Sequence, residues 1–161
     1  MVVILHNIRS LHNVGSIFRT ADGAGVEKLY LCGITPGPLN RFGEVLSDIK
    51  KTALGAENSI AWEKVKTTAQ AIKELKKDGF KIVAVEQDKK SIPYFKLKAN
   101  SSQLSQIALV LGAEVDGLPR SILKKCDTIV EIPMHGKKES LNVSIAFGII
   151  AFHFVQRLKT K

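Results

Sequence analysis

Short apolar runs separated by helical stretches are the feature that most restricts how this chain can fold. Several runs are continuous Val, Ile and Leu, as in strands that are covered on both faces. We expect strands at Val2–His6, Lys28–Cys32, Ser59–Trp62, Lys81–Glu86, Ile107–Leu111 and Thr128–Ile132. We expect helices at Asn13–Ala24, Glu44–Leu54, Thr67–Asp78 and Leu141–Leu158, with a short turn at Arg120–Lys124. This alternation predicts an α/β fold whose mostly parallel sheet has helices on both faces.

The length and the local signals indicate one domain. The 161 residues are enough to bury a sizeable core without disulfides or metals. No repeat, low-complexity tract or linker divides them, so we expect a single domain over residues 1–161. Asn13 and Thr67 are placed to act as N-caps, and Gly79 is placed to end a helix.

Composition argues against several classes of protein. Cys32 and Cys126 are too few and too far apart for a disulfide framework or a zinc site, and the four histidines lack metal-ligand spacing. The longest apolar stretch, from Ile145 to Phe152, is far too short to span a membrane, and no basic leader precedes the first strand. We therefore expect a cytoplasmic protein with no bound metal and no membrane association.

The charge of the chain favours contact with a polyanion. Its 24 Lys and Arg against 15 Asp and Glu give a formal net charge of +9. Such an excess attracts nucleic acid over long range. Lysines in helical stretches such as 73–77 could equally form solvated helix faces. The excess of basic residues is therefore only a modest indication of nucleic-acid binding.

The stretch Leu141–Leu158 is apolar on almost every side of a helix. It carries almost no polar stripe before Gln156, and such a helix must be buried on most of its surface. In so small a domain a homodimer interface would supply that cover, and we favour it. The alternative is a central core helix in a monomer.

Three polar segments stand where strands meet loops or helices. They span residues 13–22, 112–119 and 132–142, and they combine glycines with hydrogen-bonding side chains. Ligand sites of α/β proteins form at the carboxyl ends of strands. We expect the three segments to converge on sites for a substrate and a cofactor.

The common nucleotide motifs do not account for these segments. Gly23 and Gly25 follow a helix instead of the first strand, and Lys28 stands where a dinucleotide fingerprint requires glycine. Residues 112–117 have the glycine spacing of a phosphate loop, but Leu118 and Pro119 replace the Lys and Ser or Thr that hold phosphate and magnesium. No hydrolase nucleophile elbow is present.

In order and spacing, the segments resemble the SpoU-type (TrmH-like) RNA 2′-O-ribose methyltransferases of the SPOUT superfamily. The first corresponds to Asn13 through Val26, the second to Leu109 through Leu118, and the third to Ile132 through Ala146. The resemblance covers essentially the whole chain. It implies S-adenosylmethionine as methyl donor and a C-terminal deep trefoil knot. It also implies a homodimer with its site near the dimer interface.

The resemblance assigns roles to individual residues. It implies that cofactor is held by Leu111, Gly112, Glu114, Gly117, Ile132, Pro133, Met134, Ser140, Leu141 and Asn142. It implies that catalysis involves Arg19, Asn13, Glu114, Ser140 and Asn142. Taken alone, the apolar members would be plain core residues, and Ser140 could be a helix cap.

Arg19 and Glu114 are the charged members of the catalytic set. A guanidinium is a poor base, so Arg19 either deprotonates the ribose hydroxyl or, with less demand on its chemistry, stabilises the developing alkoxide and a phosphate. A carboxylate that follows a buried strand needs a cationic or amide partner. We expect Arg19 to be the partner of Glu114.

Minimal members of the family tend to modify tRNA, so tRNA is a more favoured substrate than rRNA. We see no separate RNA-binding domain, so RNA would be held by basic surface residues. The candidates are Arg9, Arg19, Arg41, Lys50, Lys51, Lys137 and Lys138. Two alternatives remain: an RNA-binding protein of this fold without catalysis, and a methyltransferase that acts on RNA bases.

Overall fold

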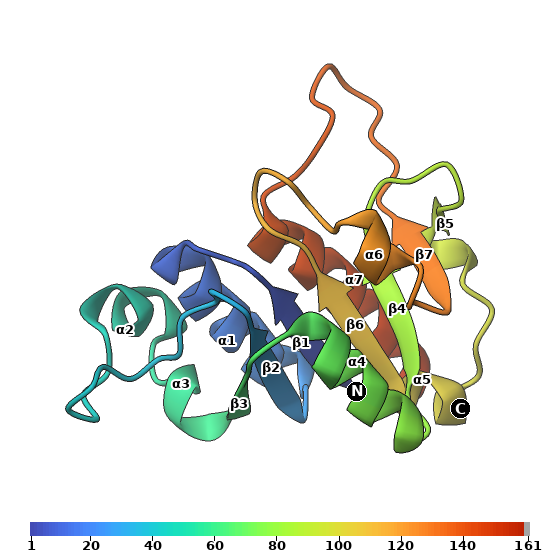
Figure 1. Ribbon diagram of the computed structural model, residues 1–161. Coiled ribbons are helices and arrows are strands. Elements are labelled where there is room, and N and C mark those ends of the chain that lie inside the picture. The colour runs from blue at the N-terminus through green and yellow to red at the C-terminus, as the bar shows by residue number, and fades with distance from the viewer. Residues whose placement is uncertain (160–161) are drawn as a thin grey trace.

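The computed structural model describes residues 1–159, which form one seven-stranded sheet (Figure 1). The order across the sheet is β3-β2-β1-β6-β4-β7-β5, and every pairing is parallel. The strands are β1 Val2–His6, β2 Lys28–Cys32, β3 Ala61–Val65, β4 Lys81–Val85, β5 Ile92–Pro93, β6 Ile107–Leu111 and β7 Thr128–Glu131. Because all strands run the same way, all their carboxyl ends lie at one edge of the sheet.

Helices cover both faces of the sheet and bury two cores. They are α1 Leu11–Ala24, α2 Ser47–Ala53, α3 Ala56–Ser59, α4 Thr68–Lys77, the 3₁₀ turn η1 Tyr94–Lys96, α5 Ser101–Ser105, α6 Arg120–Leu123 and α7 Val143–Lys159. Strand β1 shows the alternation: Val3 and Leu5 join the core beneath α1 and α7, whereas Val2 and Ile4 join the core beneath α4. The predicted α/β class is confirmed.

Several predicted boundaries are wrong. The stretch 56–59 is a short helix, so β3 begins at Ala61 instead of Ser59, and α2 begins at Ser47 instead of Glu44. Strand β5, the turn η1 and helix α5 were not predicted. Thr67 does cap α4, where its hydroxyl accepts from the amide of Gln70, and Gly79 follows that helix with a φ of +83°.

Two helices begin differently from the prediction. Helix α1 is capped by Ser10, whose hydroxyl accepts from the amide of Asn13, so the expectation that Asn13 is the cap is wrong. Helix α7 begins at Val143, and the side-chain oxygen of Asn142 accepts from the amide of Ser144. Both asparagines therefore stand at helix starts, where their side chains reach across to other segments.

Helix α7 is buried along one side only. Phe147, Ile150, Ala151 and Phe154 are fully buried in the core beside α1. In contrast, the side chains of Ile145, Ile149 and Phe152 are exposed to 55, 36 and 45%. These three lie at helical spacing and form an uncovered apolar stripe.

Within residues 1–159, no helix is long and apolar enough to cross a membrane. The same residues contain no cluster of three or more His, Cys, Asp or Glu side chains that could hold a metal ion.

Candidate functional site

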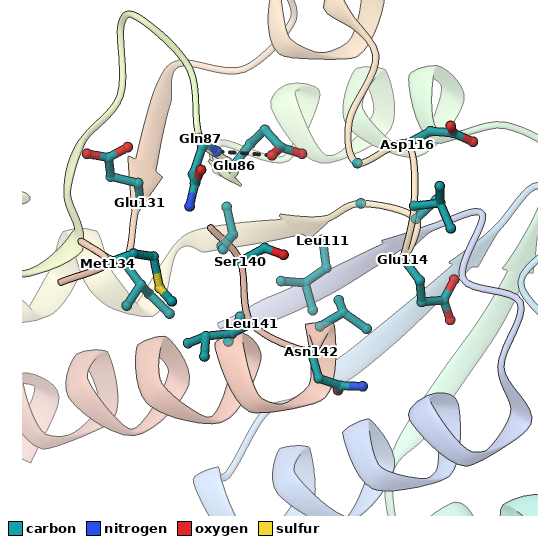
Figure 2. Close-up of a pocket in the computed structure, with 18 residues that line it drawn as sticks. Glu86, Gln87, Leu111, Glu114, Asp116, Glu131, Met134, Ser140, Leu141 and Asn142 are labelled. Carbon is teal, nitrogen blue, oxygen red and sulfur yellow. Dashed lines mark hydrogen bonds between the residues drawn. The ribbon is translucent and has the colours of Figure 1, made fainter. Parts of the chain in front are cut away.

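A cavity of about 490 Å³ opens at the carboxyl ends of β4, β6 and β7 (Figure 2). It is lined by residues 85–87 from the end of β4 onward, 111–117 from the end of β6 onward, 131, 132 and 134 from the end of β7 onward, and 140–143 with 146 around the start of α7. Pro133 and Lys138 line an adjoining hollow of about 370 Å³ that shares four residues with the cavity. The volume is in the range of small-molecule sites.

The loop after β6 depends on Gly112 for its own closure. Ala113 and Gly117 exchange two backbone hydrogen bonds, of 3.0 and 3.2 Å, and so pinch the loop at its base. A Cβ on Gly112 would lie 2.5 Å from the carbonyl carbon of Gly117 and 2.7 Å from the amide nitrogen of Leu118. Gly117 has a φ of +60°, in the left-handed region that favours glycine. The glycines are thus explained by the geometry of the loop, whether or not a cofactor approaches them.

Replacement of Gly112 by alanine should therefore destabilise the loop. The added methyl group would overlap backbone that cannot move alone, which costs about 1–3 kcal/mol in packed interiors. We expect the melting temperature to fall by about 2–12 °C. Gly136→Ala is the matched control, because nothing lies within 4 Å of its added Cβ, and it should melt like the parent. Equal melting of the two variants would contradict this explanation of Gly112.

Acidic side chains line the cavity, although the chain as a whole is basic. Glu86, Glu114, Asp116 and Glu131 line it, whereas no Lys, Arg or His of the described residues does. Glu86 is held by the amides of Leu118, at 2.7 Å, and Gln87, at 3.0 Å. The Oε2 atom of Glu131 accepts from the hydroxyl of Ser91 at 2.7 Å. Such a lining favours a cationic ligand and disfavours a phosphate.

A hydrogen-bonded chain joins the three polar segments beside the cavity. The Oε1 atom of Glu114 accepts from the side-chain amide of Asn13 at 3.1 Å. The Oδ1 atom of Asn13 accepts from the side-chain amide of Asn142 at 3.1 Å, and Asn142 in turn accepts from the Ser144 hydroxyl at 2.7 Å. In Figure 2 the carboxylate of Glu114 points toward α1, and Met134 and Glu131 lie on the opposite side of the cavity. The three segments therefore converge.

The partners of Glu114 are amides, not the arginine that we expected. Besides Asn13, the backbone amides of Ser10, at 3.0 Å, and Arg9, at 3.2 Å, donate to its carboxylate. Partial burial alone would raise the pKa of Glu114, but these hydrogen bonds outweigh it and hold the pKa below its ordinary value. The expectation that Arg19 pairs with Glu114 is wrong.

Arg19 lies outside the cavity. It sits on the exposed surface of α1, and within residues 1–159 its side chain makes no hydrogen bond or ion pair. Arg9, Arg41, Lys50, Lys51, Lys137 and Lys138 are exposed as well, and they are spread over several loops and helix α2.

Nine of the ten predicted cofactor residues line the cavity, and Pro133 lines the adjoining hollow. Nine other lining residues were not in the predicted set: Val85, Glu86, Gln87, Ala113, Val115, Asp116, Glu131, Val143 and Ala146. Glu86 and Gln87 are polar residues at the carboxyl end of a predicted strand. The rule that ligand sites of α/β proteins form at the carboxyl ends of strands would have identified both residues from the sequence.

Comparison with known proteins places this geometry in a family. The model of the SpoU rRNA Methylase family matches residues 1–152. The 23S rRNA (guanosine-2′-O-)-methyltransferase RlmB of Xanthomonas axonopodis pv. citri is 33% identical over 98% of this chain and 59% of its own. RlmB of Escherichia coli K12 is 32% identical over 97% and 60%. The chain thus spans about three fifths of the length of these relatives.

Two solved structures agree in fold over nearly the whole chain. The A. aeolicus TrmH/SpoU tRNA modifying enzyme superposes with a TM-score of 0.81 at 31% identity, covering 98% of this chain and 74% of that one. An AdoMet-bound rRNA methyltransferase from Sinorhizobium meliloti gives 0.85 at 27% identity, covering 99% and 57%. The family match, the cavity and the three converging segments lead to one conclusion: the chain belongs to the SpoU rRNA Methylase family.

Proposed function

We propose that this protein transfers a methyl group from S-adenosylmethionine to a ribose 2′-hydroxyl of RNA. The observation that carries the proposal is the acidic cavity on which the three segments converge. S-adenosylmethionine bears a positive sulfonium group and no phosphate, which suits a lining of four carboxylates and no cation among the described residues. A relative of the same family has been solved with AdoMet bound.

Different lining residues would contact different parts of the cofactor. Leu111, Ile132 and Leu141 supply apolar surface for the adenine, and Met134 closes one side. Glu131 lines the cavity, and one of its carboxylate oxygens, Oε1, accepts no hydrogen bond within residues 1–159. When bound, the cofactor would supply an electrophilic methyl group. Gly112, Glu114, Gly117, Pro133, Ser140 and Asn142 complete the proposed cofactor set.

The proposed catalytic residues act on the ribose side. The guanidinium of Arg19 makes no hydrogen bond or ion pair within residues 1–159, and because a guanidinium is a poor base we assign it to stabilise the developing alkoxide and a neighbouring phosphate. Asn13, Glu114 and Asn142 would hold the segments in register through their hydrogen-bonded chain. Ser140, exposed at the rim of the cavity, would contact the ribose.

We also propose that the protein forms a homodimer through the stripe of Ile145, Ile149 and Phe152. The exposure of three large apolar side chains on one helix supports this assembly. A C-terminal trefoil knot, which follows from the family resemblance, and a cytoplasmic location are further parts of the proposal. The side-chain amide of Gln87 donates to the backbone carbonyl of Glu139 at 2.5 Å and so holds the loop before α7 against the loop after β4.

The proposal leaves open whether the substrate is tRNA or rRNA. The two curated relatives above are named for 23S rRNA, whereas one solved relative is named for tRNA. The curated relatives therefore lend no support to the predicted preference for tRNA. Parallel methylation of purified tRNA and rRNA fractions would decide, because the substrate fraction alone should gain label.

The acidic lining leads to a prediction about the cofactor. Glu131→Gln removes a charge from the cavity at nearly constant shape, and we expect it to weaken binding of S-adenosylmethionine about tenfold. Binding of adenosine, which is neutral, should stay within about twofold. Calorimetry with both ligands measures this, and Glu74→Gln on the surface of α4 is the control. Equal loss for both ligands would argue against a role for charge.

A further inference from the structure

The segment between β2 and α2 carries an exposed aromatic side chain on a rigid turn. Phe42 is 71% exposed, more than any other aromatic residue in the described part of the chain. The guanidinium of Arg41 lies 4.6 Å from the centroid of its ring. Figure 1 shows this segment projecting beside α2, away from the sheet.

The turn is held in one conformation by Asn40. Its side-chain oxygen accepts from the amides of Phe42, at 2.9 Å, and Glu44, at 3.0 Å, and its side-chain amide donates to the Glu44 carboxylate at 3.0 Å. Gly43 supplies the left-handed residue with a φ of +80°, and Leu39 pairs with Val45 at the base. The turn of residues 39–45 thus presents a phenyl ring that is largely exposed, with the Arg41 guanidinium over one part of it.

The start of the segment is anchored as well. The ammonium group of Lys64 donates to the carbonyls of Gly33 and Thr35, and the side chain of Asn7 accepts from the amide of Ile34 at 3.1 Å. The segment follows the carboxyl end of β2, so it leaves the sheet at the edge where the cavity opens. The contacts at its start and within its turn hold the tip in a fixed place.

The local charge favours an anionic partner. Lys50 and Lys51 lie on the neighbouring helix α2. Glu44 and Asp48 are the nearby carboxylates, and Asp48 pairs with Lys51, so the three cations Arg41, Lys50 and Lys51 outnumber them by one. Arg41 forms no ion pair within the part of the chain that the structure describes, so its charge is available.

We propose that Phe42 and Arg41 form a clamp for an unpaired base of the RNA substrate, with the base stacked on the phenyl ring and the guanidinium on the adjoining phosphate. Aromatic rings bind unpaired bases by stacking, and an arginine beside the ring adds electrostatic attraction. In a duplex the bases are already stacked and their faces are inaccessible. The clamp therefore prefers single-stranded RNA. This proposal rests on the proposed function only in that RNA is the substrate.

Fluorescence anisotropy with a labelled 15-nucleotide RNA, single-stranded or annealed to its complement, tests the clamp. Phe42→Ala should weaken single-strand binding about tenfold and leave duplex binding within about twofold, and Phe42→Tyr should restore it. Arg41→Ala should weaken both RNAs, whereas Arg41→Lys should retain most duplex affinity. Phe95→Ala, a second exposed aromatic on η1, is the matched control and should bind like the parent.

The outcomes separate this proposal from the enzymatic one. Single-strand affinity of Phe42→Ala within twofold of the parent, or an equal loss for both RNAs, would overturn the clamp. A change in the mass of Phe42→Ala by light scattering, without any change in RNA affinity, would also overturn it and assign Phe42 to a contact between copies. Calorimetry of the parent with S-adenosylmethionine is independent of these results, and absence of binding there would count against the proposed enzyme only.

Discussion

Arg19→Ala should sharply reduce methyl transfer while the affinity for S-adenosylmethionine stays within about twofold of the parent. The expected loss in turnover is about 10²–10³-fold, which is the effect of removing one preorganised donor from a developing oxyanion. Cofactor affinity should survive because Arg19 does not line the cavity. Single-turnover assays with labelled cofactor and RNA measure the first quantity, and calorimetry measures the second.

Arg120→Ala is the control, since Arg120 is also an exposed arginine on a helix and has no proposed role. Arg19→Lys separates charge from geometry: partial rescue would indicate electrostatic stabilisation, because an ammonium keeps the charge but lacks the planar donor pair. Turnover of Arg19→Ala equal to that of the parent would remove this residue from the mechanism.

Ile149→Asp should convert the proposed dimer into a monomer and remove the proposed methyl transfer with it. Ile149 lies at the centre of the exposed stripe on α7, where a carboxylate in an apolar interface would be buried without a partner. Within one protomer the position is more than one third exposed, so the fold should survive. Light scattering gives the mass of the particle, and circular dichroism confirms that the variant is folded.

Leu54→Asp controls for the added charge, because Leu54 is an exposed leucine that ends helix α2. That variant should remain dimeric and active. A parent protein that is monomeric at micromolar concentration, or an Ile149→Asp variant with the mass of a dimer, would show that the stripe is not a dimer interface.

The central strands were predictable, whereas at the edges of the sheet β3 was predicted two residues too early and β5 was not predicted. Strands β1, β6 and β4 are covered on both faces, so the sequence of each is an almost continuous run of apolar residues. Strand β3 lies at the edge of the sheet and includes the exposed Glu63 and Lys64, so it carries no such signal. The short β5 at the other edge contains Pro93. Helix α5 did have a signal, the capping box of Asn100 and Gln103, which the prediction overlooked.

The cavity was predictable in its segments but not in its contacts. Glycines and polar residues at strand ends indicated where ligands would bind. The partners of Glu114 depend on which loop reaches it in space. Two of them are the backbone amides of Arg9 and Ser10, and because every residue has such an amide, residue types do not predict these contacts. The role of Asn13 could not be read for the same reason, because a helix-start asparagine looks like a cap whether or not it bonds to Asn142.

One measurement tests the proposed activity most directly. The protein is incubated with RNA and S-adenosylmethionine carrying a deuterated methyl group, and the RNA is then digested to nucleosides for mass spectrometry. The proposal predicts label on the ribose of a 2′-O-methylnucleoside, and at least about 100-fold less label in the same time when Arg19→Ala replaces the parent. Label on a base, or no label with either tRNA or rRNA although the cofactor binds, would contradict it.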